Sequence, residues 1–83
     1  MEARVITKDN CPYCVKAKSL LTIKGIPYTE QKLGVDLTVD ELRTLLPDAR
    51  TVPQIWLDDL YVGGYTQLES YFEKVENGTG HQR

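Results

Sequence analysis

Short apolar runs separated by polar clusters divide the first half of the chain into three elements. Residues 3–7 form a β-prone run that ends in the polar residues 8–10. Apolar residues then recur at helical spacing, which predicts a helix that begins at Pro12 and stops near Gly25. A second strand is expected at 27–32. These elements form a β-α-β unit.

The second half predicts a helix, a hairpin and a last helix. Thr38 and Glu41 have the spacing of a capping box, so a helix should begin there and end at Pro47. Strands at 54–57 and 60–62 are separated by two aspartates, which is typical of a hairpin.

The last helix is expected to open at Thr66, with Glu69 completing a second capping box. We expect a single domain over residues 1–76 and a flexible tail over 77–83, which has no apolar residue. The aromatic residues of the second half are assigned to core or sheet packing: Trp56, Tyr61 and Phe72.

The predicted order is therefore β-α-β-α-β-β-α. This order indicates an α/β sandwich in which helices cover a four-stranded mixed sheet.

Composition narrows the function classes. The chain has 83 residues, a hydrophobic share of 41%, a charged share of 27% and a net charge of −2. These values are typical of one small globular domain. The interspersed charges predict no nucleic-acid surface, and no apolar run is long enough to predict a membrane span. Glu2 and Arg4 near the N-terminus do not fit the layout of a secretory signal. We expect a cytoplasmic monomer.

The two cysteines, Cys11 and Cys14, form a CxxC pair at the predicted start of the first helix. A disulfide between them would close a very short loop, so it would stabilise the fold little. With Pro12 as the first helical residue, Cys11 is the N-cap, and its sulfur faces unpaired N–H groups, those of Tyr13 and Cys14. The positive helix terminus, with Lys8 upstream, should lower the pKa of Cys11 below the value of about 8.5 for a free thiol. Cys11 is thus the predicted nucleophile, and Cys14, one turn deeper, is the resolving thiol.

A zinc site is the alternative interpretation of the pair. Structural zinc needs four ligands, and the chain has no second CxxC and only one histidine, His81, in the tail. No metal is therefore expected.

Three segments resemble the signature segments of dithiol glutaredoxins of the CPYC type. They are Cys-Pro-Tyr-Cys at 11–14, Thr-Val-Pro at 51–53 and Gly-Gly-Tyr-Thr at 63–66, and the similarity extends to about Val75. The resemblance implies a thioredoxin-like fold. It also implies a glutathione-disulfide oxidoreductase, with glutathione as reductant and with disulfide or glutathionylated proteins, ribonucleotide reductase among them, as partners.

The resemblance also implies a set of glutathione-binding residues. Pro53 should be cis, and the backbone of Val52 should pair with the glutathione peptide like an added strand. Lys8 and Gln54 should lie near the glycine carboxylate, and residues 64–66 near the γ-glutamyl end, at a helix N-terminus suited to anions. The full implied set is Lys8, Tyr13, Thr51, Val52, Pro53, Gln54, Gly64, Tyr65, Thr66 and Gln67.

Gln67 departs from the family pattern. Many glutaredoxins have Asp at this position, where it meets the α-ammonium group of glutathione. Gln accepts a hydrogen bond but has no charge, so γ-glutamyl recognition should be weaker.

Two other functions fit parts of the pattern. A redoxin of the same fold that depends on thioredoxin reductase, a flavin enzyme, typically has Ser-Gly-Phe where this chain has Gly-Gly-Tyr. An iron–sulfur carrier usually keeps a single cysteine followed by Gly-Phe-Ser, whereas this chain has Pro12 and Cys14.

Overall fold

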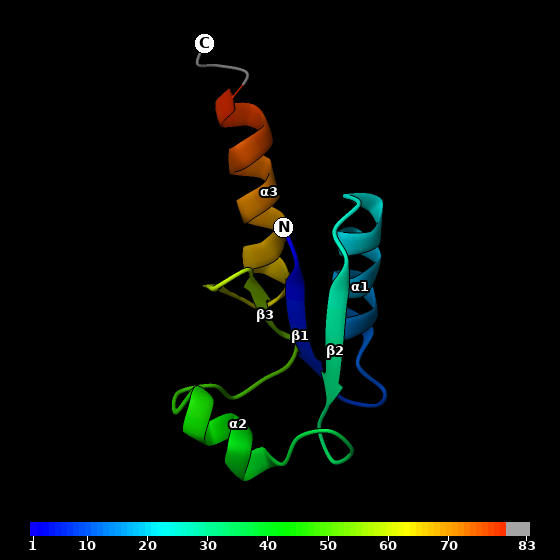
Figure 1. Ribbon diagram of the computed structural model, residues 1–83, viewed down its shortest axis with the longest axis vertical. Coiled ribbons are helices and arrows are strands. Elements are labelled where there is room, and N and C mark those ends of the chain that lie inside the picture. The colour runs from blue at the N-terminus through cyan, green and yellow to red at the C-terminus, as the bar shows by residue number, and fades with distance from the viewer. Residues whose placement is uncertain (80–83) are drawn as a thin grey trace.

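The computed structural model describes residues 1–79 and has the predicted order of elements (Figure 1). The strands and helices are β1 (Ala3–Thr7), α1 (Pro12–Ile23), β2 (Tyr28–Lys32), α2 (Val39–Leu45), β3 (Gln54–Leu57), β4 (Leu60–Gly63) and α3 (Tyr65–Thr79).

The four strands form one mixed sheet in the order β2-β1-β3-β4. β1 runs parallel to β2 and antiparallel to β3, and β3 pairs with β4 as an antiparallel hairpin. The predicted four-stranded mixed sheet is confirmed. β1 lies between β2 and β3, and the chain passes from its carboxyl end into the loop that ends at Cys11, the N-cap of α1.

Alternation along β1 divides the apolar residues between two clusters on opposite faces of the sheet. Val5 belongs to the larger cluster, which packs the sheet against α1 and α3, and Ile6 belongs to a smaller cluster with Leu42 of α2. The buried members of the larger cluster are Ala3, Val5, Ala17, Leu21, Ile55, Leu57, Leu68 and Phe72. Figure 1 shows α1 behind β2, and α2 separated from the other helices at the far end of the sheet.

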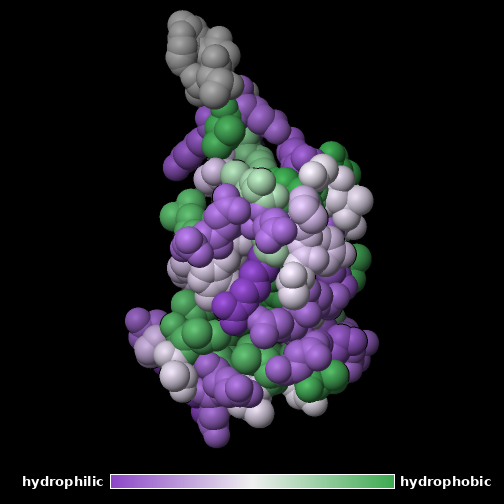
Figure 2. All heavy atoms as spheres, in the orientation of Figure 1, coloured by the Kyte–Doolittle hydropathy of each residue, from purple (hydrophilic) through white to green (hydrophobic). Residues whose placement is uncertain are grey.

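The same view drawn as spheres shows that the face of the sheet opposite α1 and α3 is mainly polar (Figure 2). Apolar residues gather below this polar region, toward the end of the molecule where α2 lies. On this face the rings of Trp56 and Tyr61 lie 5.4 Å apart between centroids, so both pack on the sheet as expected.

The end of α1 explains why it stops before Gly25. The N–H of Ile26 donates to the carbonyl of Leu21 at 2.9 Å, and the N–H of Gly25 donates to that of Thr22 at 3.0 Å. These two bonds form a Schellman motif, which requires a left-handed residue, and Gly25 has φ +72°.

The capping predictions had different outcomes. The Thr38–Glu41 box is confirmed in both directions at the start of α2. The Thr66–Glu69 box is wrong: with Thr66 as the N-cap the helix would begin at Gln67, but α3 begins two residues earlier, at Tyr65. Gln67 instead reaches back, and its Oε1 accepts the N–H of Gly64 at 3.0 Å. With Gly64 as the N-cap, Gln67 occupies the position from which a Glu or Gln side chain normally makes this bond.

The predicted tail begins within α3, which is described to Thr79. The rest of that tail, with His81, lies outside the described residues, so its flexibility stays a prediction. Over residues 1–79, no helix is both long enough and apolar enough to cross a membrane.

Candidate active site

Cys11 is the N-cap of α1, as the position of Pro12 predicts. Its backbone is extended (φ −121°, ψ 97°), Pro12 starts the helix, and the backbone N–H of Cys14 donates to the Cys11 sulfur over 3.2 Å. Of the two N–H groups expected to face this sulfur, the structure shows that of Cys14. The sulfur therefore lies at the positive end of α1.

Cys11 and Cys14 form a disulfide, with their Cα atoms 5.2 Å apart. Cys11 is 8% exposed and Cys14 is 2% exposed. Cys14 is the more deeply buried because it faces the core one turn into the helix. The assignment of Cys11 as the attacking thiol and Cys14 as the resolving thiol stays a prediction.

The segment 51–53 lies beside the disulfide. The Val52–Pro53 bond is cis, which confirms that prediction, and the carbonyl oxygen of Val52 is 3.7 Å from the sulfur of Cys11. Over residues 1–79 the backbone N–H of Val52 donates to no other group. The edge of this segment is thus open to an added strand.

The Gly-Gly-Tyr-Thr segment meets both other segments. A Cβ on Gly64 would lie only 3.6 Å from the carbonyl oxygen of Pro53, so the two backbones pass close together. The rings of Tyr13 and Tyr65 lie 5.9 Å apart between centroids. Gly63 has φ +115°, a conformation that side-chain-bearing residues rarely adopt. The fold thus brings together three segments that are far apart in the sequence.

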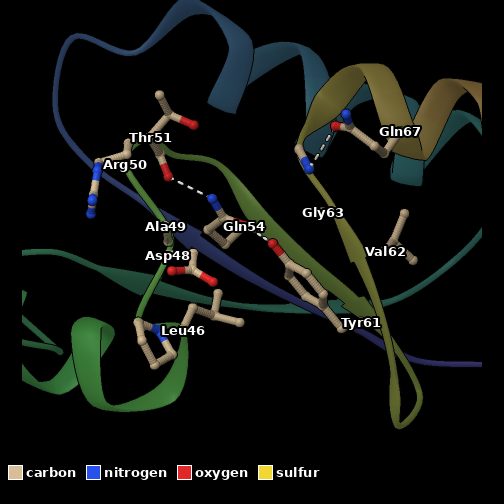
Figure 3. A pocket seen from close by; sticks show the side chains of 12 residues that line it. Leu46, Asp48, Ala49, Arg50, Thr51, Gln54, Tyr61, Val62, Gly63 and Gln67 are labelled. Carbon is tan, nitrogen blue, oxygen red and sulfur yellow. Dashed lines mark hydrogen bonds between the residues drawn. The ribbon is translucent and has the colours of Figure 1, made fainter.

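A cavity of about 610 Å³ opens between the loop after α2 and the start of α3 (Figure 3). It includes four of the predicted glutathione-binding residues: Thr51, Gln54, Gly64 and Gln67. The remaining lining residues are Leu46, Pro47, Asp48, Ala49, Arg50, Tyr61, Val62 and Gly63.

Lys8 lies between the cysteine pair and the segment 51–53. It lines a second cavity, of about 600 Å³, together with both cysteines, and a smaller one together with Thr51 and Val52. Its side chain is exposed, as is that of Thr66. Their predicted contacts with glutathione stay predictions, as do those of the other residues in the set.

Gln54 is expected near the glycine carboxylate of glutathione, but its side chain is buried and not open to solvent. It is 5% exposed, and its amide nitrogen donates to the carbonyl of Thr51 while its Oε1 accepts the hydroxyl of Tyr61. Sequence reasoning missed this role of Tyr61. The signal available was the hairpin. Tyr61 pairs with Trp56, and Trp56 lies on the same face of β3 as Gln54, two residues before it.

Glu30 lines the second cavity together with Cys14. Its carboxylate accepts the hydroxyl of buried Thr7 at 2.7 Å and pairs with the amine of Lys18 at 3.2 Å. The Thr7 hydroxyl lowers the pKa of Glu30 below its ordinary value of 4.5; partial burial opposes this, and Lys18 adds to it.

Among residues 1–79, no group of three or more His, Cys, Asp or Glu side chains could hold a metal ion.

A cysteine pair that caps the first helix beside a cis-proline defines a dithiol protein of the thioredoxin-like fold. The family model for glutaredoxin matches residues 4–62 of this chain. The chain therefore belongs to the glutaredoxin family, whose dithiol members are thiol–disulfide oxidoreductases.

Curated relatives agree with this family. Glutaredoxin 3 of Escherichia coli K12 is 36% identical over 64 residues, which are 77% of either chain. Glutaredoxin 1 of Rickettsia conorii is 40% identical over 67 residues, covering 77% of this chain and 65% of the relative. The hybrid peroxiredoxin hyPrx5 of Haemophilus influenzae is 41% identical over 68 residues, but this chain spans only 28% of its length.

Solved structures support the fold. The solution structure of glutaredoxin from Brucella melitensis has a TM-score of 0.74 at 28% identity, covering 92% of this chain and 85% of the other. Glutaredoxin 1 from Francisella tularensis has a TM-score of 0.72 at 27% identity, covering 92% and 96%.

The first prediction concerns Glu30. A carboxylate whose pKa is lowered by folding stabilises the native state above its unfolded pKa, and this contribution is lost as the pH falls through the folded pKa. Wild type should therefore be more stable than Glu30→Gln at neutral pH, and the difference should shrink as the pH falls below 4.5. Urea unfolding of both proteins, in the same redox state, measures it.

Glu73→Gln on the exposed surface of α3 is the matched control. A Glu30→Gln difference that stays constant down to acidic pH would show that Glu30 does not stabilise the fold through its charge.

Proposed function

We propose that this protein is a glutathione-dependent oxidoreductase that reduces protein disulfides and glutathione mixed disulfides through Cys11 and Cys14. The observation that carries the proposal is the position of Cys11. Its sulfur caps α1, accepts a backbone N–H and lies beside the Val52 carbonyl. The helix terminus and the N–H of Cys14 stabilise a thiolate there, and the thiolate is the attacking species.

Reduction of a protein disulfide uses both cysteines. The Cys11 thiolate attacks one sulfur of the client, a Cys11–client disulfide forms, and the other client sulfur leaves and takes a proton. Cys14 then loses its proton and attacks the Cys11 sulfur, which releases the reduced client and leaves the Cys11–Cys14 disulfide seen here. The client gains two electrons and the cysteine pair loses two.

Glutathione returns the pair to the dithiol. One glutathione thiolate attacks Cys11 and frees Cys14, and a second attacks the resulting mixed disulfide to release oxidised glutathione. A glutathionylated client needs Cys11 alone: Cys11 takes over the glutathione, and a second glutathione removes it. The two client types thus depend differently on Cys14.

The open backbone of Val52 supports glutathione as the ligand, because a peptide can add to it like a strand. The start of α3 beside the cavity offers unpaired N–H groups to the γ-glutamyl carboxylate. Lys8 provides a positive charge between the disulfide and Thr51. The proposed setting is the cytosol, where a monomer would serve disulfide or glutathionylated proteins, ribonucleotide reductase among them.

The second prediction separates the roles of the cysteines. Cys11→Ser should lose all activity, because no other group attacks the substrate. Cys14→Ser should still reduce glutathione mixed disulfides but lose most reduction of protein disulfides, since the resolving step is missing. The measurement is an assay in which NADPH and glutathione reductase regenerate glutathione, run with a glutathionylated peptide and with a disulfide-bonded protein.

Replacing glutathione and its reductase by thioredoxin reductase gives the control for the alternative electron donor. Equal losses in both cysteine variants would contradict the assignment of roles. Reduction of wild type by thioredoxin reductase, with none by glutathione, would overturn the proposed function.

The third prediction concerns Gln67, whose Oε1 accepts the N–H of Gly64 at the edge of the larger cavity. The residue at this position is expected to meet the α-ammonium group of glutathione. A carboxylate there would accept a hydrogen bond about twice as strong as the one a neutral amide accepts, although solvent reduces the gain at an exposed site. Gln67→Asp should therefore lower the apparent KM for a glutathionylated peptide a few-fold, on the order of 1 kcal/mol or less. The kcat should change little, because the contact is remote from the sulfur.

Ser70→Asp, one turn further along α3, adds the same charge away from the cavity of Figure 3 and is the matched control. A KM that is unchanged or higher in a folded Gln67→Asp protein would show that Gln67 does not lie at the ligand. The γ-glutamyl site would then consist of Tyr65 and Thr66 alone.

A further inference from the structure

Gln54 is one of two buried polar side chains in the described part of the chain, and its amide is held at both ends. Its Nε2 donates to the carbonyl of Thr51 at 2.7 Å, and its Oε1 accepts the hydroxyl of Tyr61 at 2.5 Å (Figure 3). A carbonyl can only accept, so the bond to Thr51 fixes which end of the amide carries the nitrogen. Tyr61 must therefore be the donor to Oε1.

The ring of Tyr61 is itself held on the polar face of the sheet. It packs on Trp56, and the guanidinium of Arg4 lies 4.8 Å from the centroid of the Trp56 ring. The Nε of Arg4 in turn donates to Gln31 on β2. This row crosses all four strands, so contacts within the sheet hold the Tyr61 ring, whose hydroxyl reaches Gln54 at the start of β3.

The Gln54 amide bonds to the segment 51–53, which lies beside Cys11. Thr51 and Gln54 flank the cis Val52–Pro53 bond, and the Val52 carbonyl lies 3.7 Å from the Cys11 sulfur. The bond from Gln54 to Thr51 spans this segment. It therefore restrains the backbone on which a strand-like ligand would pair.

We propose that Tyr61 is a positioning residue for the glutathione-linked substrate. Its hydroxyl locks the Gln54 amide, which sets the Thr51–Pro53 backbone and leaves the second N–H of Nε2 for an acceptor in the cavity that Gln54 lines. Without the hydroxyl, the amide can rotate and the backbone site is no longer preorganised. The proposal rests on the proposed function, because it concerns binding of the same substrate.

Tyr61→Phe tests the proposal, with kcat and apparent KM measured for a glutathionylated peptide. The KM should rise about two- to tenfold, the range expected for loss of one neutral hydrogen bond. The kcat should stay within about twofold, because Tyr61 contacts neither sulfur and supports ground and transition states alike. Tyr28→Phe, on the opposite edge strand β2, removes a hydroxyl for which the structure shows no hydrogen bond and is the control.

A double-mutant cycle shows whether Tyr61 acts through Gln54. Gln54→Ala should raise the KM, and adding Tyr61→Phe should raise it no further, whereas independent effects would multiply. Loss of stability alone would not produce this pattern, and urea unfolding of each variant measures that loss separately.

The outcomes separate this proposal from the proposed function. A wild-type protein without glutathione-dependent turnover would overturn both. An active wild type whose Tyr61→Phe variant keeps the KM of Tyr28→Phe, loses only kcat, or multiplies the effect of Gln54→Ala would overturn the positioning role alone.

Discussion

The hydrogen bond from the backbone N–H of Cys14 to the sulfur of Cys11 is the interaction on which the rest of the site depends. It exists because Pro12 starts α1 and leaves Cys11 as the N-cap, with an extended backbone that turns the sulfur toward the first helical turn. The same turn places Cys14 one turn deeper, against the core. The start of the helix at Pro12 therefore buries Cys14 more deeply than Cys11. It also places the Cys11 sulfur at the positive helix terminus.

The sheet supplies what this local arrangement lacks. Because β1 and β3 are neighbours, the loop after β1 and the segment before β3 meet at the same end of the sheet, and Val52 lies against Cys11. The hairpin then returns the chain through Gly63 and Gly64, close to Pro53. The order of the strands thus brings together segments that are far apart in the sequence, next to Cys11.

Much of this could be predicted from the sequence, because the deciding signals are local. Proline at the first helical position, the Thr38–Glu41 box and the β-prone run of β1 are each read from a few neighbouring residues. The start of α3 could not be read in this way, since Thr66 and Glu69 have the spacing of a capping box but the helix is capped by the bond between Gln67 and Gly64. The link from Tyr61 to Gln54 also escaped, because a hydroxyl reaching across a hairpin leaves no periodic pattern.

The titration of Cys11 tests the central claim, that the start of α1 activates this sulfur. Ultraviolet absorbance of the thiolate is followed against pH in the reduced Cys14→Ser protein, so that only Cys11 contributes, and again in urea. The account predicts a midpoint well below the value of about 8.5 for a free thiol, returning to that value on unfolding. A midpoint near about 8.5 in the folded protein would contradict it, because the helix terminus would then provide no stabilisation of the thiolate.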